Sequence, residues 1–130
     1  MERAVIERAV IESGRAEFAL NTVKGIVNKE NDKTKKEFKS YVRKFPSLIL
    51  TNGLAAAVAF AVDKGGSYTL IYDIISKWLK DKGFFDNPAT LVEYICSLDS
   101  DMYRVATNEV LSLFEWLKRF ATGMIEGDDS

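Results

Sequence analysis

The side chains that could do chemistry in this chain are carboxylates, amines, guanidinium groups and phenols, because it has no histidine and one cysteine. Without histidine, a nucleophilic serine or cysteine lacks its usual activating base, and histidine-containing zinc sites cannot form. Cys96 alone can form neither an internal disulfide nor a thiolate metal cage, and it fits a reducing compartment. Any enzyme here would have to use acids, lysines, arginines or tyrosines.

The acidic residues do not form a catalytic pattern. Asp99 and Asp101 stand at the start of a predicted helix, where capping and the helix dipole favour acids. Glu109 and Glu115 are six residues apart, so they lie on different faces of that helix. Neither pair makes a carboxylate metal site. The sequence therefore predicts a protein that is not an enzyme, with no metal and no cofactor.

Positive charge is concentrated in one segment. Residues 29–44 contain seven basic and three acidic residues, a net charge of +4, whereas the whole chain carries −1. Several of these cations share one broad helix face, which suits phosphate contacts that need charge but no base edges. Lys118 and Arg119 add charge on the last helix, as does Arg104, which is also expected to pair locally with Asp99 or Asp101. The candidate RNA or partner contacts are Lys35, Lys36, Lys39, Arg43, Lys44, Lys118 and Arg119.

Three aromatic residues, Phe38, Tyr41 and Phe45, accompany the basic segment. Aromatic rings beside a basic groove can stack on nucleobases. The alternative is a solvated, lysine-rich helix whose aromatic residues anchor it to the core. Trp78 and Trp116 are interpreted in the same structural way, as core or groove residues.

An uncharged apolar stretch, residues 45–62, is predicted to be the centre of the fold. Pro46 suits the first turn of a helix, and Gly65 suits the position after its end, so one buried helix is expected over about residues 46–64. Its alanines and polar residues favour a soluble bundle over a membrane span. Asn52 is expected to be buried and to bond the backbone of a neighbouring helix.

The remaining elements are also helices, and no alternating strand pattern appears. Helices are expected over about residues 1–29, with Val5 and Ala9 in the apolar stripe, over a short basic segment 32–43 capped by Asn31, and over 67–82 capped by Ser67. A short helix should begin at Asn87-Pro88, and a long one should run from about 99 to 122. The apolar stripe of the helix over 67–82 is expected at Leu70, Ile71, Ile74, Ile75, Trp78 and Leu79, and that of the last helix at Met102, Ala106, Val110, Leu113, Leu117 and Phe120. The prediction is an all-α bundle of five or six helices in one domain, residues 1–125, followed by a disordered acidic tail, residues 126–130.

Two groups of motifs resemble a known family. Tyr41-Val42-Arg43-Lys44-Phe45-Pro46-Ser47-Leu48-Ile49, Asn52-Gly53-Leu54 and Ala59-Phe60 are similar to the first half of the small all-helical subunit of the type III-B CRISPR Cmr complex. Trp78-Leu79, Asp99, Tyr103-Arg104, Thr107-Asn108-Glu109 and Leu113-x-x-Trp116-Leu117-Lys118-Arg119-Phe120-Ala121 match the second half. The resemblance covers about residues 41–121, and residues 1–40 match only as a helix followed by a basic helix.

The resemblance implies a scaffold subunit without catalytic activity. Such subunits stack with further copies of themselves in a minor filament, beside the backbone subunits that hold the guide RNA. Their basic face lines the groove for guide and target RNA, which makes Arg43, Lys44, Lys118 and Arg119 the candidates at matched positions. Lys35, Lys36 and Lys39 extend this set on electrostatic grounds only, and Asn52, Gly53 and Trp116 are assigned to the fold.

The localisation and the rival functions follow from the same features. The N-terminus shows no signal-peptide pattern, so a cytoplasmic protein without membrane contact is expected. The alternative function is a generic helical protein–protein adaptor that makes no RNA contact.

Overall fold

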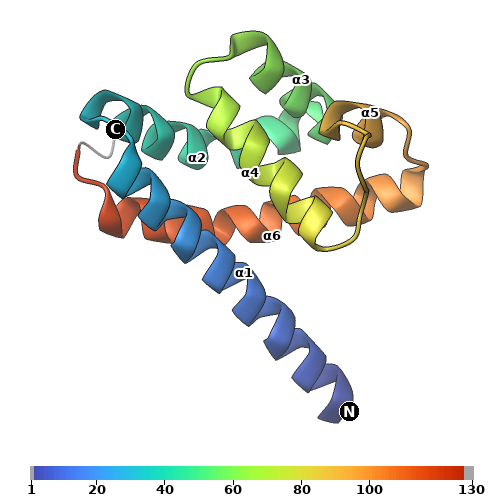
Figure 1. The fold of residues 1–130 in the computed structure, drawn as a ribbon. Coiled ribbons are helices and arrows are strands. Elements are labelled where there is room, and N and C mark those ends of the chain that lie inside the picture. Colours follow the sequence, from blue (N-terminus) through green and yellow to red (C-terminus); the bar gives the residue numbers. More distant parts are fainter. Residues whose placement is uncertain (1, 128–130) are drawn as a thin grey trace.

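The computed structural model describes the backbone of residues 2–127 and the side chains of residues 14–127. The described residues form six helices and no strand, which confirms the predicted all-α fold. Figure 1 shows α6 along one side of the body, α1 crossing it, and α2 to α5 on the other side. The helices are α1 (Glu2–Lys29), α2 (Asp32–Asn52), α3 (Leu54–Lys64), α4 (Tyr68–Asp81), α5 (Leu91–Cys96) and α6 (Ser100–Met124).

The apolar stretch 45–62 is divided between two helices, so the prediction of one helix beginning at Pro46 is wrong. The basic segment continues through Pro46 as α2 and ends only at Asn52. Proline removes one helical hydrogen bond, but Phe45 and Ile49 on either side of it are almost fully buried. Their burial, on the face that also buries Phe38 and Val42, favours continuing the helix.

Gly53 joins the two helices. Its N–H donates to Ile49 O at 2.7 Å, which closes α2, and its carbonyl accepts from Ala57 N at 3.0 Å, which opens α3. Its φ of 92° lies in the left-handed region that favours glycine. Tyr103 of α6 completes the joint, because its hydroxyl accepts the Ala55 N–H at 2.8 Å. Asn52 beside this joint is exposed, so the prediction that it is buried is wrong.

The core follows the predicted stripes on the long helices. On α4, Ile71, Ile74, Ile75, Trp78 and Leu79 are buried, and on α6, Ala106, Val110, Leu113 and Leu117 are fully buried. The exception is Met102, which is predicted on the same stripe of α6 but is exposed at the first turn. On α1, Val23 and Ile26 are buried, whereas the predicted stripe residues Val5 and Ala9 lie outside the described side chains.

Two predicted helix caps are confirmed by their side-chain bonds, one occupies the N-cap position without such a bond, and one is wrong. Asn31 accepts the Thr34 N–H at 2.8 Å and Asp99 accepts the Met102 N–H at 2.9 Å. Ser67 instead donates its hydroxyl to Glu37 at 2.8 Å, which ties α4 to α2. The fifth helix begins after Thr90 rather than at Asn87-Pro88, because Thr90 and Glu93 form a complete capping box.

We expect Gly53→Ala to lower the free energy of unfolding by about 1–3 kcal/mol, because alanine is strained at this positive φ. A Cβ at Gly53 would also lie 3.0 Å from the Tyr103 hydroxyl. Removing that hydroxyl with Tyr103→Phe should cost about 1 kcal/mol alone, and it should make the cost of Gly53→Ala smaller. Urea unfolding of the two single variants and the double variant measures this coupling. Strictly additive costs would show that the close approach of the two groups has no energetic role.

Candidate nucleic-acid and partner interface

The predicted cations are positioned by the antiparallel pair α2 and α6. Two contacts fix the register of the pair: the rings of Phe45 and Phe114 stack with centroids 5.4 Å apart, and Lys39 Nζ donates to Ile125 O at 3.0 Å. Residues 43 and 44 of α2 and residues 118 and 119 of α6 all lie between these two contacts in the sequence of their helices. The fold thus brings the motif-matched cations onto two neighbouring helices.

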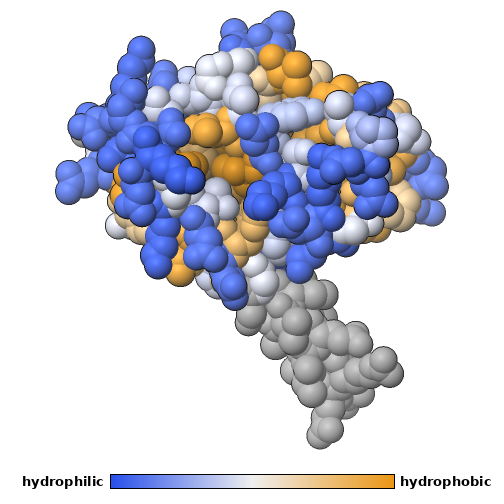
Figure 2. Space-filling view, in the orientation of Figure 1, coloured by the Kyte–Doolittle hydropathy of each residue, from blue (hydrophilic) through white to orange (hydrophobic). Residues whose placement is uncertain are grey.

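Four of the predicted cations are exposed: Lys36, Arg43, Lys44 and Arg119. Lys35 and Lys118 are half-buried, and Lys35 forms an ion pair with Asp32 at 3.3 Å. The Arg119 guanidinium lies 5.1 Å from the centre of the Trp116 ring, a cation–π distance. In Figure 2, hydrophilic side chains gather over the N-terminal end of α2 and its junction with α1.

Lys39 does not belong to the exposed face on which the sequence places it. Its side chain is 4% exposed, and its ammonium donates to Ile125 O at 3.0 Å and to Gly127 O at 3.4 Å. A buried ammonium needs hydrogen-bond acceptors, and the chain beyond α6 supplies them as backbone carbonyls. Lys39 therefore fixes the C-terminal segment to α2, and it cannot meet a phosphate in this conformation.

The aromatic residues of the basic segment belong to the core, as the alternative interpretation expects. Phe38 and Phe45 are buried, so stacking on bases by these two residues is excluded. Tyr41 stacks on Tyr68 of α4 with ring centroids 3.9 Å apart and an interplanar angle of 7°. Burial raises the pKa of Tyr68, and the neighbouring Tyr41 raises it further.

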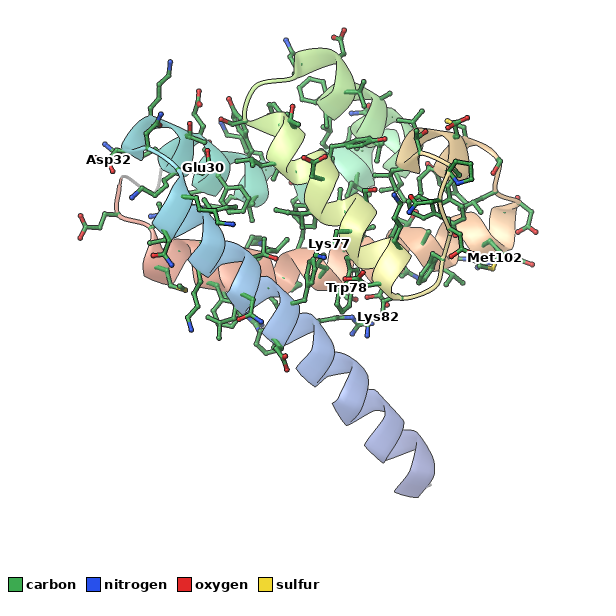
Figure 3. All side chains as sticks on the ribbon, viewed as in Figure 1. Glu30, Asp32, Lys77, Trp78, Lys82 and Met102 are labelled. Atoms are coloured by element: carbon green, nitrogen blue, oxygen red, sulfur yellow. The ribbon has the colours of Figure 1, made fainter. Side chains whose placement is uncertain are left out.

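A polar cluster that the sequence did not predict lies where α1, α4 and α6 meet. Glu109 of α6 accepts from Arg15 of α1 through Nε at 2.8 Å and Nη2 at 3.0 Å. It also accepts from Trp78 Nε1 of α4 at 2.9 Å. Lys82 lies over the Trp78 ring at 4.6 Å, and Figure 3 shows both side chains close to this crossing.

The electrostatics of this cluster favour the ionised carboxylate. Burial alone would raise the pKa of Glu109, but hydrogen bonds from Arg15 and Trp78 and the positive charges of Arg15 and Lys82 outweigh burial and lower it. No sequence signal pairs Arg15 with Glu109, because 94 residues separate them. The sequence analysis considered Glu109 only in the motif Thr107-Asn108-Glu109 and in a pair with Glu115, and neither points to Arg15.

The other acids near α6 serve the helix itself. Asp99 is the N-cap, and Asp101 pairs with Arg104 at 3.0 Å, the local ion pair expected from the sequence. Among the described residues, no group of three or more acidic, cysteine or histidine side chains is arranged to hold a metal ion. Within the same residues, no helix combines the length and apolar character needed to cross a membrane.

A second surface feature is a groove of about 460 Å³ between α1 and α4. Phe18, Ile26 and Leu70 form its apolar part, and Lys29, Glu30 and Lys77 are among its polar lining residues. Figure 2 shows an apolar strip between these two helices, bordered by hydrophilic side chains. The lining residues of this groove are more typical of a protein–protein interface than of a phosphate-binding site.

Comparison with known proteins identifies a family and a similar solved structure. The model of the family described as CRISPR-associated protein (Cas_Cmr5) matches residues 11–124. The fold is similar to the X-ray crystal structure of a CRISPR-associated Cmr5 family protein from Thermus thermophilus, with a TM-score of 0.75 and 28% sequence identity. That match covers 89% of this chain and 98% of the Thermus chain.

We expect Lys39→Met to lower the free energy of unfolding by about 1–3 kcal/mol, because it leaves the buried Ile125 carbonyl and the part-buried Gly127 carbonyl without their donor. Lys36→Met removes the same charge from an exposed position of α2, so its cost should stay within about 0.5 kcal/mol. Urea unfolding monitored by tryptophan fluorescence compares the two. Equal costs would show that the Lys39 bonds to the C-terminal segment do not stabilise the fold.

Glu109→Gln should cost about 1.5–3 kcal/mol at pH 7, since it removes a charged acceptor and turns an N–H₂ group toward other donors. The folded-state pKa of Glu109 is below its ordinary value of 4.5, so the unfolded state binds more protons between the two values. The contribution of the carboxylate is therefore complete above the unfolded pKa and is lost as the pH falls through the folded pKa. The stability difference between wild type and Glu109→Gln, measured by urea unfolding from pH 7 to 3, should shrink below about pH 4.5. A difference that stays constant over this range would contradict the ionised cluster.

Proposed function

We propose a scaffold role from one premise: this chain belongs to the Cas_Cmr5 family of CRISPR-associated proteins, whose members are subunits of the type III-B Cmr complex. The observation that carries the proposal is the family match over residues 11–124, combined with cations exposed on α2 and α6. The chain therefore partners other Cmr subunits. The proposal adds what it does there: it supports RNA binding and cleavage by the complex without catalysing a step itself.

The hydrogen bonds and ion pairs that the carboxylates form within the chain support the non-catalytic role. Glu109, Asp99 and Asp101 are held by bonds that build or cap helices. A general acid or base would need access to a bound substrate, and both carboxylate oxygens of Glu109 are engaged within the fold by Arg15 and Trp78. The cutting of target RNA is assigned to other subunits of the complex.

In the proposed arrangement, copies of the chain stack as a minor filament beside the backbone subunits that hold the guide RNA, in the cytoplasm. Arg43, Lys44, Lys118 and Arg119 contact the RNA backbone or the backbone subunits, and Lys35 and Lys36 extend the positive surface. Each copy contributes few contacts, which are weak alone. Repeated along a filament, they become strong because each further contact is intramolecular.

The second candidate is a helical adaptor that binds protein and no RNA. Two observations favour it: Lys35 and Arg119 already have partners within the chain, and the α1–α4 groove is apolar. An adaptor predicts assembly that does not respond to the charge of α2. The two candidates therefore differ in one measurable property.

Native mass spectrometry of the chain, mixed with the backbone subunit and a guide RNA from the same genome, tests the scaffold role. Several copies entering one defined ribonucleoprotein are expected. A chain that enters the complex and keeps the same occupancy when α2 is made acidic would favour the adaptor. A chain that stays apart would contradict the scaffold role and leave the adaptor as the leading candidate.

Arg43→Glu with Lys44→Glu should leave the fold intact, because both side chains are exposed, and should weaken retention of target RNA by the assembled complex. A loss of about tenfold at 100 mM salt is expected, since two phosphate contacts become repulsive. The matched control is Lys24→Glu with Lys64→Glu, which reverses two exposed charges on α1 and α3. RNA retention is measured by filter binding over a series of salt concentrations. Equal losses in the two double variants would contradict a specific role for the α2 face.

A further inference from the structure

The α1–α4 groove lies between two helices that an aromatic contact holds together at one end. There the rings of Phe18 and Trp78 have their centroids 4.8 Å apart. Toward the C-terminal end of α1, Lys29 and Leu70 are among the lining residues. The α1 side of the groove extends from Phe18 to Glu30, a helical span of about 18 Å. The groove is therefore long enough for about three turns of another helix.

Gly25 lines this groove in the middle of α1. Glycine destabilises a helix relative to alanine, because it loses more conformational freedom on folding. A Cβ at Gly25 would meet no atom of the described neighbouring residues within 4 Å. Packing within the chain therefore does not require a glycine at this position. A glycine here does allow a second molecule to approach the α1 backbone closely.

The exposed face of α3 matches the groove in length and character. Ala56, Ala59 and Val62 are exposed at intervals of three residues, so they form one row, the α3 ridge. Val62 is 56% exposed, and α3 contains no charged residue before Asp63. The 11 residues of α3 extend about 16 Å, close to the length of the groove. Because helices with small side chains at a contact pack at short interaxial distances, the ridge can approach α1 at Gly25.

The α3 ridge and the groove belong to different sides of the molecule. Figure 1 shows α3 on one side of α4 and α1 on the other. A copy whose groove is filled therefore keeps its own ridge free for the next copy. A heterologous contact of this kind repeats from copy to copy.

The charges beside the two surfaces are complementary. Lys29 is exposed at the open end of the groove, and Asp63 is exposed at the C-terminal end of the α3 ridge. With α3 of one copy parallel to α1 of the next, the Asp63 carboxylate faces the Lys29 ammonium. The charge pair thus selects one of the two directions in which a helix can lie in the groove.

We propose that α3 of one copy docks in the α1–α4 groove of the next copy, with Asp63 facing Lys29. The inference deepens the proposed function and rests on its filament of stacked copies, because it names the surfaces that join them. One short helix in one groove buries less area than a standard interface. The free chain should therefore associate weakly, with a Kd of about 0.1–1 mM.

Sedimentation equilibrium of the full chain, up to about 1 mM, measures this association. Gly25→Leu should weaken it about tenfold or more, because leucine fills the groove, while its high helix propensity keeps α1 folded. The matched control is Gly123→Leu, at an exposed glycine of α6 whose Cβ would likewise meet no atom within 4 Å. A wild type that stays monomeric at the highest concentration, or equal association of the two variants, would overturn the inference.

Charge reversal tests the direction of the docked helix. Lys29→Glu and Asp63→Lys should each weaken self-association by about threefold to tenfold at low salt, because an exposed attraction becomes a repulsion. The double variant should regain most of the loss, since opposite charges face each other again. Losses that simply add in the double variant would contradict the pairing of Lys29 with Asp63 and overturn the proposed docking.

Native mass spectrometry of the assembled complex separates this inference from the proposed function. Gly25→Leu should enter the complex in fewer copies than wild type. Equal entry of several copies of both would make the α3–groove contact wrong and leave the scaffold role intact. Self-association that Gly25→Leu abolishes, in a chain that stays apart from the backbone subunit, would support the contact and contradict the scaffold role. A variant that self-associates like wild type but is lost from the complex would assign the groove to another subunit and overturn the inference.

Discussion

The carboxylate of Glu109 is the interaction on which the arrangement of the long helices depends. It accepts two hydrogen bonds from Arg15 of α1 and one from Trp78 of α4, while its own helix is α6. Apolar burial alone lets packed helices slide, because hydrophobic contact has no preferred direction. A carboxylate with three directed donors fixes both the crossing point and the rotation of each helix. Figure 1 shows why this matters for α1, whose backbone runs beyond the other helices at its N-terminal end.

Lys39 has the corresponding role for α2. Its buried ammonium ties the middle of this helix to the chain that follows α6, and the stack of Phe45 on Phe114 adds an apolar contact further along. Two charged side chains, Glu109 and Lys39, thus specify how α6 packs against α1 and α2. Both are partly or fully desolvated, so their cost of burial is offset only in the native register. This makes them determinants of which packing forms.

Local sequence patterns predicted the helices well and their junctions poorly. The stripes on α4 and α6 and the caps Asn31 and Asp99 depend on neighbours within a few residues, which the sequence displays directly. The joint at Gly53 depends on the bond from Ala55 to Tyr103, 48 residues further along the chain. The continuation of α2 through Pro46 depends on burial of Phe45 and Ile49 in the core. The residues around Pro46 allow a helix that begins at the proline and also a helix that continues through it, so tertiary contact decided which of the two formed.

Local sequence patterns are limited in the same way at the candidate interface. This explains why some of the predicted cations are exposed and others have partners within the chain. Sequence patterns assigned seven cations to one surface role, but a lysine on a helix face is exposed or buried according to what packs beside it. Here the chain after α6 covers Lys39, Asp32 engages Lys35 and Trp116 holds Arg119, whereas Lys36 and Lys44 extend into solvent. A surface with so few cations cannot bind a polyanion tightly as a single copy. In the proposed scaffold role, such contacts would add up only within an assembly, and weak individual binding would keep the free chain from capturing unrelated RNA.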